Sequence, residues 1–572
     1  MRQLLQAYRR QLANYDSLLA YSLLGLVGGI ASGLIVLAFE LAIQETARLW
    51  GVAGGEDFES LPRWLLFALP VSGAIALGAV FSMLQPEDRE IGIVHVLSRM
   101  HSHYGALPLR NAIVQFVGGA FALATGQSGG REGPGVHLGG AINSQLGQHL
   151  GLPNNSLRVL IACGTAGGIA AAFGTPLAGV IFAMEVIVAE YTVVGFLPVM
   201  LAAVSASVIS RYFAKGGVML AIPEVAPVTL PEMPLVIGLG LACGLAVTLF
   251  IYLLRLTSRL SHWPVMLRFA LGGLLTGALA LEVPHVLGIG YDSLAQVLRG
   301  ELAWSLLLAL AACKLLCTAV SCGVGMPIGL IGPNLLIGAC LGGLAGMAGA
   351  ALLPETPIDA TLYVVIGMAA AMGAVLNAPL AAILAALELT DSINIGFAAL
   401  LAIVAATLTS HGIFRQRSAH QTALRQLQRM LPDDPLNQLL HRTDVTTRMD
   451  ASVSRIHALL PKASAEPLLM AAPAWCLVSR EGEDLYLVQG GELSDWLRAR
   501  AQEEEADLTQ ADIRRWSVAN VPVQATLRQA LDIMRRDTVE AVCVYGRGRG
   551  GERLLQGVVT RDSIEKFTLA NL

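Results

Sequence analysis

The sequence predicts an all-α polytopic membrane protein, built as an inverted repeat of tilted and broken helices and followed by a small α/β domain. Three features support this prediction: the composition, the lengths of the apolar segments and an internal repeat. Of the 572 residues, 54% are hydrophobic, only 14% are charged and 60 are glycines. This composition lies outside the range of soluble enzymes, so we expect a membrane protein and not an enzyme.

The apolar segments extend along the chain to about residue 412. The charged residues of the stretch 111–210 are few: Arg131, Glu132, Arg158, Glu185 and Glu190. Such a stretch must lie in lipid or inside protein. Several apolar segments, such as 379–389, are too short to cross a hydrocarbon core of about 30 Å at about 1.5 Å per residue. Helices that end inside a membrane are tolerated only within protein or beside a wet cavity, so they indicate a transport site.

An internal repeat divides the apolar region into two halves. The segment GTAGGIAAAFGTPLAGVIFAMEV, which starts at Gly164, aligns without gaps on GMAAAMGAVLNAPLAAILAALEL, which starts at Gly367. A Pro-Leu-Ala triplet and a glutamate recur in the same register 203 residues later, the glutamate as Glu185 and Glu388. Two homologous halves follow, and transporters commonly relate such halves by inverted topology with the binding site between them.

The flanks of the apolar region predict the topology. The basic segment MRQLLQAYRRQLANYDS is interpreted as a cytoplasmic flank and not as a signal peptide, and the Arg-rich segment after Phe414 places the other chain end on the same side. We expect a multi-pass inner-membrane protein with both termini in the cytoplasm. The expected parts are a flank at 1–18, membrane repeats at 19–215 and 216–415, a linker at 416–448 and a soluble domain at 449–572.

Charge and cysteine content exclude some partners. The formal net charge of −4 is close to neutral for this length, which gives no case for a nucleic-acid partner. The eight cysteines form no CxxC pair and most lie in apolar stretches, so we expect neither disulfides nor a metal site.

The densest motif is GQSGGREGPGVHLGG, at residues 126–140. Its glycines let the backbone approach a ligand closely, and Pro134 suits the first turn of a helix. The free amides of a helix N-terminus bind an anion without a cationic side chain. We therefore predict an anion site at Gly130, Arg131 and Gly133. The Glu132 carboxylate can take the place of the anion there, as a gate; a fixed helix-capping carboxylate is the alternative.

The segment GREGP, followed by VHLGG, resembles the signature of the CLC family of chloride channels and transporters. The resemblance covers about residues 20–425, and the segment P-L-A-G-x-x-F-x-x-E that ends at Glu185 strengthens it. It implies the CLC fold, a homodimer with one pore in each subunit, and transport of a small inorganic anion. It also implies that Glu132 is the extracellular gate and, in exchangers, a proton acceptor. His137 is expected to be a packed histidine.

Three further family motifs are present in altered form. The family's G-S-G-I-P, whose serine binds the central anion, falls on residues 90–94, so that Ile91 replaces the serine and Gly92 is kept. The G-x-F-x-P motif falls on residues 329–333, where Leu330, Ile331 and Gly332 still offer amides to the anion. The family's central tyrosine falls on His420, a titratable donor. With both hydroxyls gone, we expect an anion preference different from that of ordinary chloride-selective relatives.

The position after Glu185 bears on proton coupling. Exchangers of this family carry a second, inner glutamate there, but this chain has Val186. Because Glu185 recurs as Glu388, we assign the pair a structural role at helix ends. Val186 favours a channel-like or weakly proton-coupled pore. The alternative is a proton-coupled exchanger that uses Glu190, water or His420 as the inner proton acceptor.

The last third of the chain resembles a pair of CBS modules. Residues 521–567 predict a helix, a strand at 541–545, a Gly/Arg turn, a strand at 554–559 and a helix capped by Thr560 or Asp562. Residues 449–500 follow the same pattern as a degenerate first module. Such pairs can bind an adenine nucleotide, but we prefer a plain hairpin turn at 546–551, and no other cofactor is expected.

Two alternatives belong to other classes of protein. A CBS-regulated cation transporter would need acidic residues clustered in its membrane segments, which this sequence lacks. A membrane sensor that transports nothing would show no anion flux even without the Glu132 side chain. We prefer an anion transporter whose partners are a small anion, the lipid bilayer, a second copy of the chain and, in the exchanger alternative, protons.

Overall fold

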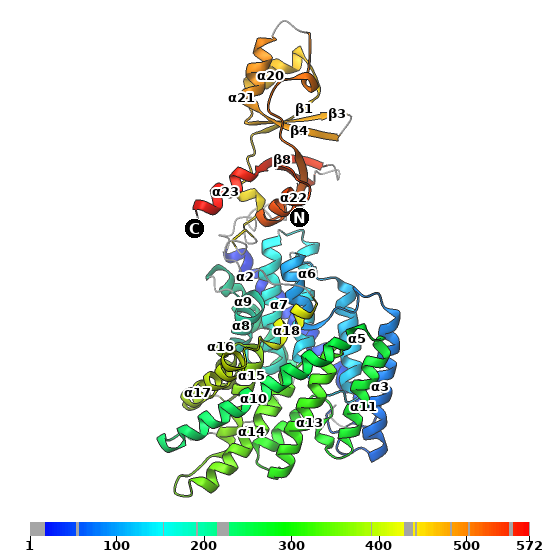
Figure 1. Cartoon of the computed structure of the whole chain (residues 1–572), viewed down its shortest axis with the longest axis vertical. Helices are drawn as coiled ribbons and strands as arrows, with labels where there is room; N and C mark the ends of the chain where they lie inside the picture. The colour runs from blue at the N-terminus through cyan, green and yellow to red at the C-terminus, as the bar shows by residue number, and fades with distance from the viewer. Residues whose placement is uncertain are drawn as a thin grey trace. The chain divides into compact units, whose positions relative to one another are not determined.

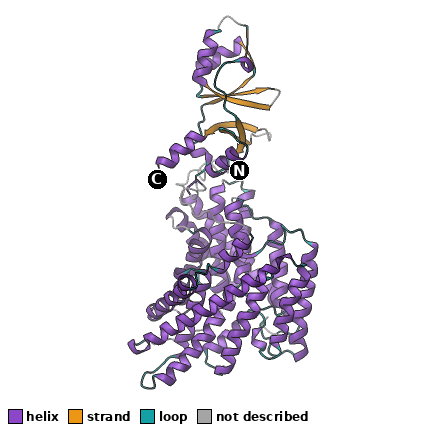
Figure 2. Ribbon diagram, in the orientation of Figure 1, coloured by secondary structure: helices purple, strands orange, loops and turns teal. Residues whose placement is uncertain are grey.

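The structure, a computed structural model, describes residues 18–52, 56–103, 105–152, 154–189, 193–213, 228–390, 392–427, 439–440, 443–480, 483–500, 504–547 and 553–570. Glu190 lies outside these residues, as do parts of the predicted flank, of the linker 416–448 and of the turn 546–551. Contacts divide the chain into a membrane unit, Tyr15–Leu150 with Leu157–Met430, and a unit centred on Leu431–Leu572. Figure 2 shows the described strands in the second unit, whereas the membrane unit is helical.

The membrane unit consists of two successive series of helices (Figure 1). The first series is α2 (Leu18–Arg48), α3 (Arg63–Met83), α4 (Gly92–Ser102), α5 (Leu109–Ala124), α6 (Glu132–His149), α7 (Asn154–Phe173), α8 (Pro176–Phe182) and α9 (Val193–Phe213). The second is α10 (Met233–Ser258), α11 (Val265–Ala280), α12 (Tyr291–Leu298), α13 (Trp304–Gly323), α14 (Ile331–Leu352), α15 (Ala360–Leu376), α16 (Pro379–Thr390) and α17 (Gly396–Thr407), with α18 (Ala419–Gln426) after it. The two series correspond in order, which confirms the predicted repeat.

The lengths of these helices fit a membrane protein with broken segments. Among the described residues, eight helices are long and apolar enough to cross a membrane. Others are shorter: α8 has 7 residues before a π-helical turn at Ala183–Val188, and α16 has 12. A 12-residue helix covers about 18 Å, so it ends inside the hydrocarbon layer or within the protein.

Glycines allow the same close packing in both series. A Cβ atom at Gly139 of α6 would collide with the carbonyl oxygen of Gly164 in α7, and one at Gly338 of α14 would collide with that of Gly367 in α15. The backbones of each pair therefore touch, as small residues permit between membrane helices. This contact fixes α6 and α14 against their neighbours and so positions their N-terminal ends.

Two short helices were not predicted, because neither is itself a long apolar segment. Helix α4 begins at Gly92, whose φ is +71°, and α12 follows Gly290, whose φ is +89°. Glycine is the residue that adopts such left-handed backbone at little cost, so both helices start at a sharp change of direction. Each start lies beside the functional site described below.

The C-terminal unit contains the same motif twice. One sheet has the order β1 (Val453–His457), β3 (Trp475–Arg480), β4 (Glu483–Gln489), and the other β6 (Val518–Pro522), β7 (Ala541–Arg547), β8 (Arg553–Thr560). In each sheet the first pair is parallel and the second antiparallel. The helices are α20 (Lys462–Ala471), α21 (Gly490–Ala499), α22 (Leu527–Arg536) and α23 (Arg561–Ala570), and the short strands β2 (Leu459–Pro461) and β5 (Glu505–Asp507) pair separately. This topology fits the predicted CBS-like pair, and nucleotide binding there stays a prediction.

Candidate anion site

The two glycine-rich motifs meet at their equivalent residues. The amide of Gly130 donates to the carbonyl of Gly329 at 2.7 Å, and the amide of Gly329 donates back to Gly130 at 2.7 Å. The two glycines hold the same position in their motifs, and each donates a hydrogen bond to the other. Two repeats related by a two-fold axis produce such a reciprocal pair of hydrogen bonds. Helices α6 and α14 each begin two residues later, at Glu132 and Ile331. Their N-termini, with amides that have no partner inside the helix, therefore lie next to each other.

The Glu132 side chain occupies the start of the other helix. It is fully buried, and its Oε2 accepts a hydrogen bond from the Gly332 amide at 3.1 Å. Its Oε1 accepts a hydrogen bond from the Tyr291 hydroxyl at the start of α12. A carboxylate at a helix N-terminus is stabilised by the amide and by the helix dipole. The carboxylate of one repeat thus accepts a hydrogen bond from an amide of the other repeat that could otherwise bind an anion.

One cavity of about 460 Å³ adjoins this junction. It is lined by predicted site residues from four separate segments: Ile91, Gly92, Gly133, Leu330 and His420. The remaining predicted residues do not line it: Gly130, Arg131, Glu132, Ile331 and Gly332. The cavity therefore ends at the bridged loops, and the Glu132 carboxylate lies beyond that end.

Gln115 of α5 ties the two loops of the cavity together. Its Oε1 accepts a hydrogen bond from the Gly92 amide at 2.8 Å, and its Nε2 donates to the Pro327 carbonyl at 3.0 Å. The Gly92 amide, predicted to face the anion, is thus engaged by a side chain. Donors for an anion are then expected mainly at the start of α14. Sequence analysis missed Gln115, which has no motif around it.

The charges on the cavity wall favour anions. Arg89, Arg259 and Arg268 line the cavity, and the carboxylate among its lining residues is Glu90. The Nε atom of Arg268 is buried without a hydrogen-bond partner among the described residues. A cavity lined by more positive than negative charge raises the local concentration of anions. These arginines were not predicted, because they lie outside the recognised motifs.

His420 does not act as a titratable donor near neutral pH. The ring is buried on α18, and burial lowers the pKa of His420 to about 4. The imidazole is therefore neutral at pH 7, and its Nδ1 atom has no hydrogen-bond partner among the described residues. The sequence predicted a titratable donor; the structure corrects this to a neutral one, because desolvation disfavours the cation.

Glu56 and Arg131 hold Tyr291, the residue that donates to Glu132. The Glu56 carboxylate accepts hydrogen bonds from the amides of Tyr291 and Asp292, at 3.0 and 3.3 Å, and so caps α12. The guanidinium of Arg131 pairs with Glu40 and lies 5.2 Å from the Tyr291 ring centre. Sequence analysis missed Tyr291; its only signal is the Gly-Ile-Gly turn before it.

Comparison with known proteins agrees with this geometry. Residues 72–411 match the family model described as voltage gated chloride channel. The chain belongs to the CLC family. It is 33% identical over 399 residues to a putative chloride channel protein, ClcB-like, of Ralstonia nicotianae, covering 68% of this chain and 92% of that protein. It is 30% identical over 438 residues to the H(+)/Cl(-) exchange transporter ClcA of Vibrio cholerae, covering 73% and 89%.

Solved structures show the same CLC fold. A slow cyanobacterial Cl-/H+ antiporter superimposes with a TM-score of 0.62 at 22% identity, covering 71% of this chain and 97% of that one. A CLC-type fluoride/proton antiporter gives 0.59 at 24% identity, covering 72% and 98%. The fold class predicted from sequence is therefore confirmed for the membrane region.

Proposed function

We propose that this CLC protein transports small inorganic anions across the membrane through the cavity, with Glu132 as the gate. The observation that carries the proposal is the hydrogen bond from the Gly332 amide to the Glu132 carboxylate. A helix N-terminus that binds a carboxylate can also bind a free anion. When Glu132 is protonated or displaced, the amides at the start of α14 become available to an anion from the cavity.

The surroundings of the gate support the same proposal. The arginines of the cavity wall attract anions to one side of the bridged loops, while the buried Glu132 carboxylate closes the passage. The two relatives compared above are described as a putative chloride channel and as an H(+)/Cl(-) exchange transporter. Chloride is therefore the first anion to test. The non-hydroxyl residues Ile91 and His420 at the cavity motivate a panel that includes fluoride and nitrate.

Two modes of transport remain as candidates. Val186 in place of the inner glutamate favours a channel-like or weakly proton-coupled pore, as predicted from the sequence. Proton-coupled exchange is the second candidate. The observation that favours it is a buried pair of hydrogen-bonded histidines: His95 lines the cavity, and His137 lies on the helix that carries Glu132.

Flux through the purified protein in liposomes tests the gate. Liposomes loaded with KCl are placed in low-chloride buffer, and chloride efflux is recorded after addition of valinomycin. We expect efflux in the wild type and, in Glu132→Ala, efflux that no longer depends on pH. Glu45→Gln, a change at an exposed glutamate of α2, is the control and should behave as the wild type.

Chloride binding provides a second readout. If Glu132 occupies an anion position, Glu132→Ala should bind an additional chloride ion by isothermal titration calorimetry. Absence of chloride efflux from both the wild type and Glu132→Ala would contradict anion transport and favour a sensor. Unchanged chloride binding and an unchanged pH profile in Glu132→Ala would instead assign Glu132 a fixed capping role.

A further inference from the structure

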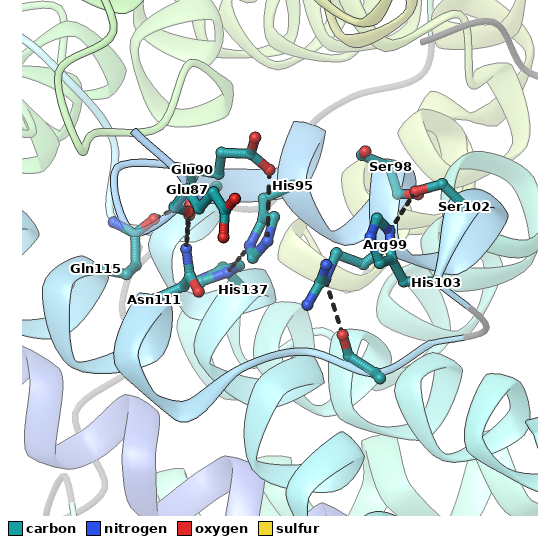
Figure 3. A network of polar contacts seen from close by, with 12 residues as sticks. Glu87, Glu90, His95, Ser98, Arg99, Ser102, His103, Asn111, Gln115 and His137 are labelled. Carbon is teal, nitrogen blue, oxygen red and sulfur yellow. Dashed lines mark hydrogen bonds and ion pairs between the residues drawn. The ribbon is translucent and has the colours of Figure 1, made fainter. Parts of the chain in front are cut away.

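Two buried histidines form a hydrogen-bonded pair beside the cavity. Nδ1 of His95 on α4 and Nε2 of His137 on α6 are 2.9 Å apart, and the two residues are 3% and 0% exposed. Figure 3 shows the two rings pointing at each other from neighbouring helices. Ionisable side chains are costly inside a membrane protein and commonly mark ion or proton pathways there.

One end of the pair is open to the cavity. His95 lines the cavity, and its Nε2 lies 3.9 Å from Oε2 of Glu90, a partly exposed carboxylate that lines the same wall (Figure 3). Asn111 holds the loop that carries Glu90, because its Nδ2 donates to the carbonyls of Glu87 and Glu90 at 2.8 and 3.0 Å. A proton from cavity water can therefore reach His95 by way of a fixed carboxylate.

The other end of the pair, at His137, does not line the cavity. Nδ1 of His137 is buried and has no hydrogen-bond partner among the described residues. His137 lies five residues after Glu132 on the same helix, which is about 7.5 Å along the axis. Because residues five positions apart also differ by about 140° around the helix, more than one water molecule is needed to join the two side chains. A ring nitrogen without a partner is thus available to pass a proton toward the gate.

We propose that Glu90, His95 and His137 form a proton route between the cavity and the Glu132 gate. The proposal rests on the proposed transport function and, within it, selects exchange over passive conduction. Each imidazole accepts a proton at one nitrogen and releases one from the other. The proton passes from Glu90 to Nε2 of His95, and the Nδ1 proton of His95 passes to Nε2 of His137. The Nδ1 proton of His137 then passes through a chain of water molecules to the Glu132 carboxylate.

The charges around the pair suit proton entry. Glu90 faces His95 from the loop before α4, and His420 faces the cavity from α18. Arg89 and Arg268 lie in the cavity wall. Of the helices packed on α6, α14 carries no charged residue, α5 carries Arg110, α7 carries Arg158 and α4 carries Arg99. Helix α2 carries Glu40, which pairs with Arg131, together with Glu45 and Arg48. Glu90 is therefore the carboxylate placed to stabilise a transient cation on His95.

The route is separate from the anion path. The anion donors lie at the start of α14, whereas the histidines join α4 to α6. Ions of opposite sign can then approach Glu132 from the same cavity without sharing a binding position. A histidine pair that serves only to pack the two helices would have no effect on proton movement, which makes the two roles distinguishable.

Simultaneous recording of chloride and proton fluxes tests the route. Full-length protein in KCl-loaded liposomes is driven by a chloride gradient, with a chloride electrode and a pH electrode in the same chamber. In His95→Gln and His137→Gln we expect the proton-to-chloride flux ratio to fall at least about tenfold, because a proton-transfer group is lost. His149→Gln, an exposed histidine near the end of α6, is the matched control and should keep the wild-type ratio.

The outcomes separate this route from the transport proposal. A wild-type flux ratio in correctly folded His95→Gln and His137→Gln would overturn the route, as would chloride flux without proton flux in the wild type; both leave anion transport standing. No chloride flux in the wild type or in Glu132→Ala would overturn transport and the route together. If the histidine variants fail to fold, Glu90→Gln, at a partly exposed position, decides: an unchanged ratio in it overturns the route.

Discussion

Glu185 and Glu388 cap each other's repeat. The Glu185 carboxylate accepts the amides of Leu380 and Ala381 at the start of α16, and Glu388 accepts those of Leu177 and Ala178 at the start of α8. The exchange is symmetric because the two residues are equivalent in the repeat. It confirms the predicted structural role at helix ends and shows that each end belongs to the opposite half of the membrane unit.

Neutralising either carboxylate should weaken the contact between the repeats. A charged acceptor at a helix N-terminus contributes about 1–2 kcal/mol when it is partly buried. We expect Glu185→Gln and Glu388→Gln each to lower the Tm in detergent by about 2–6 °C. The proton-to-chloride flux ratio should not change in Glu185→Gln. A collapse of that ratio would assign Glu185 to proton transfer.

Tyr291 should hold the gate closed. Its hydroxyl donates to the Glu132 carboxylate, and a hydrogen bond to a charged group contributes about 1.5–3 kcal/mol. Tyr291→Phe removes this bond while keeping the ring, so the carboxylate should leave the Gly332 amide more often. We expect chloride efflux from liposomes to rise about tenfold, since about 1.4 kcal/mol corresponds to that factor.

A second buried tyrosine provides the control for this experiment. Tyr363 donates a hydrogen bond to Glu232 at 2.9 Å, away from the bridged loops. Tyr363→Phe therefore removes the same kind of bond without touching the gate, and its efflux should equal that of the wild type. Equal increases in both variants would point to general loosening of the protein and would contradict a specific role of Tyr291.

Anion binding should strengthen in acid through His420. Burial lowers the pKa of His420 to about 4, and a bound anion favours the imidazolium and so raises this pKa. Binding then takes up a proton, so the chloride Kd should fall as pH is lowered from 7 to 5. The measurement belongs in a Glu132→Ala background, where the gate does not titrate. In Glu132→Ala with His420→Gln the Kd should be independent of pH; a retained slope would exclude His420 as its source.

The fold was predictable where the pattern is local. The apolar segment 379–389 corresponds to α16 (Pro379–Thr390), and the predicted strand 554–559 lies within β8 (Arg553–Thr560). The glycines of residues 126–140 indicated a helix N-terminus with free amides, and the resemblance to the CLC family implied that residues 329–333 face the same anion.

Contacts between distant segments were not predictable. Gln115 and Pro327 are 212 residues apart in sequence, and Tyr291 and Glu132 are 159 apart, yet each pair is hydrogen-bonded. The sequence pattern does not indicate such pairings, because a single polar residue in an apolar helix gives no information about which distant residue it contacts. His95 was missed for this reason.

Glu56 should make the stability of the protein depend on pH. Burial raises the pKa of Glu56 to about 7, although Arg131 and the amides of Tyr291 and Asp292 act in the opposite direction. The ordinary value is 4.5. Between these values the folded protein keeps a proton that the unfolded chain releases, so the free energy of unfolding falls as pH rises toward 7 and stays lower above it. Glu59, whose pKa is also raised to about 7 by burial and by Asp292, adds to the same slope.

Glu56→Gln removes one of these two titrations and keeps an oxygen that can accept an amide of α12. The variant should match the wild type at pH 5 and should have a Tm about 2–4 °C higher at pH 8, as measured by thermal unfolding in detergent. Glu282→Gln, at an exposed glutamate, controls for the loss of a negative charge and should show the wild-type slope. If Glu56→Gln instead loses stability at both pH values, the charged cap on α12 outweighs the cost of burying it, and Glu56 would then act with Tyr291 as a fixed support of the gate.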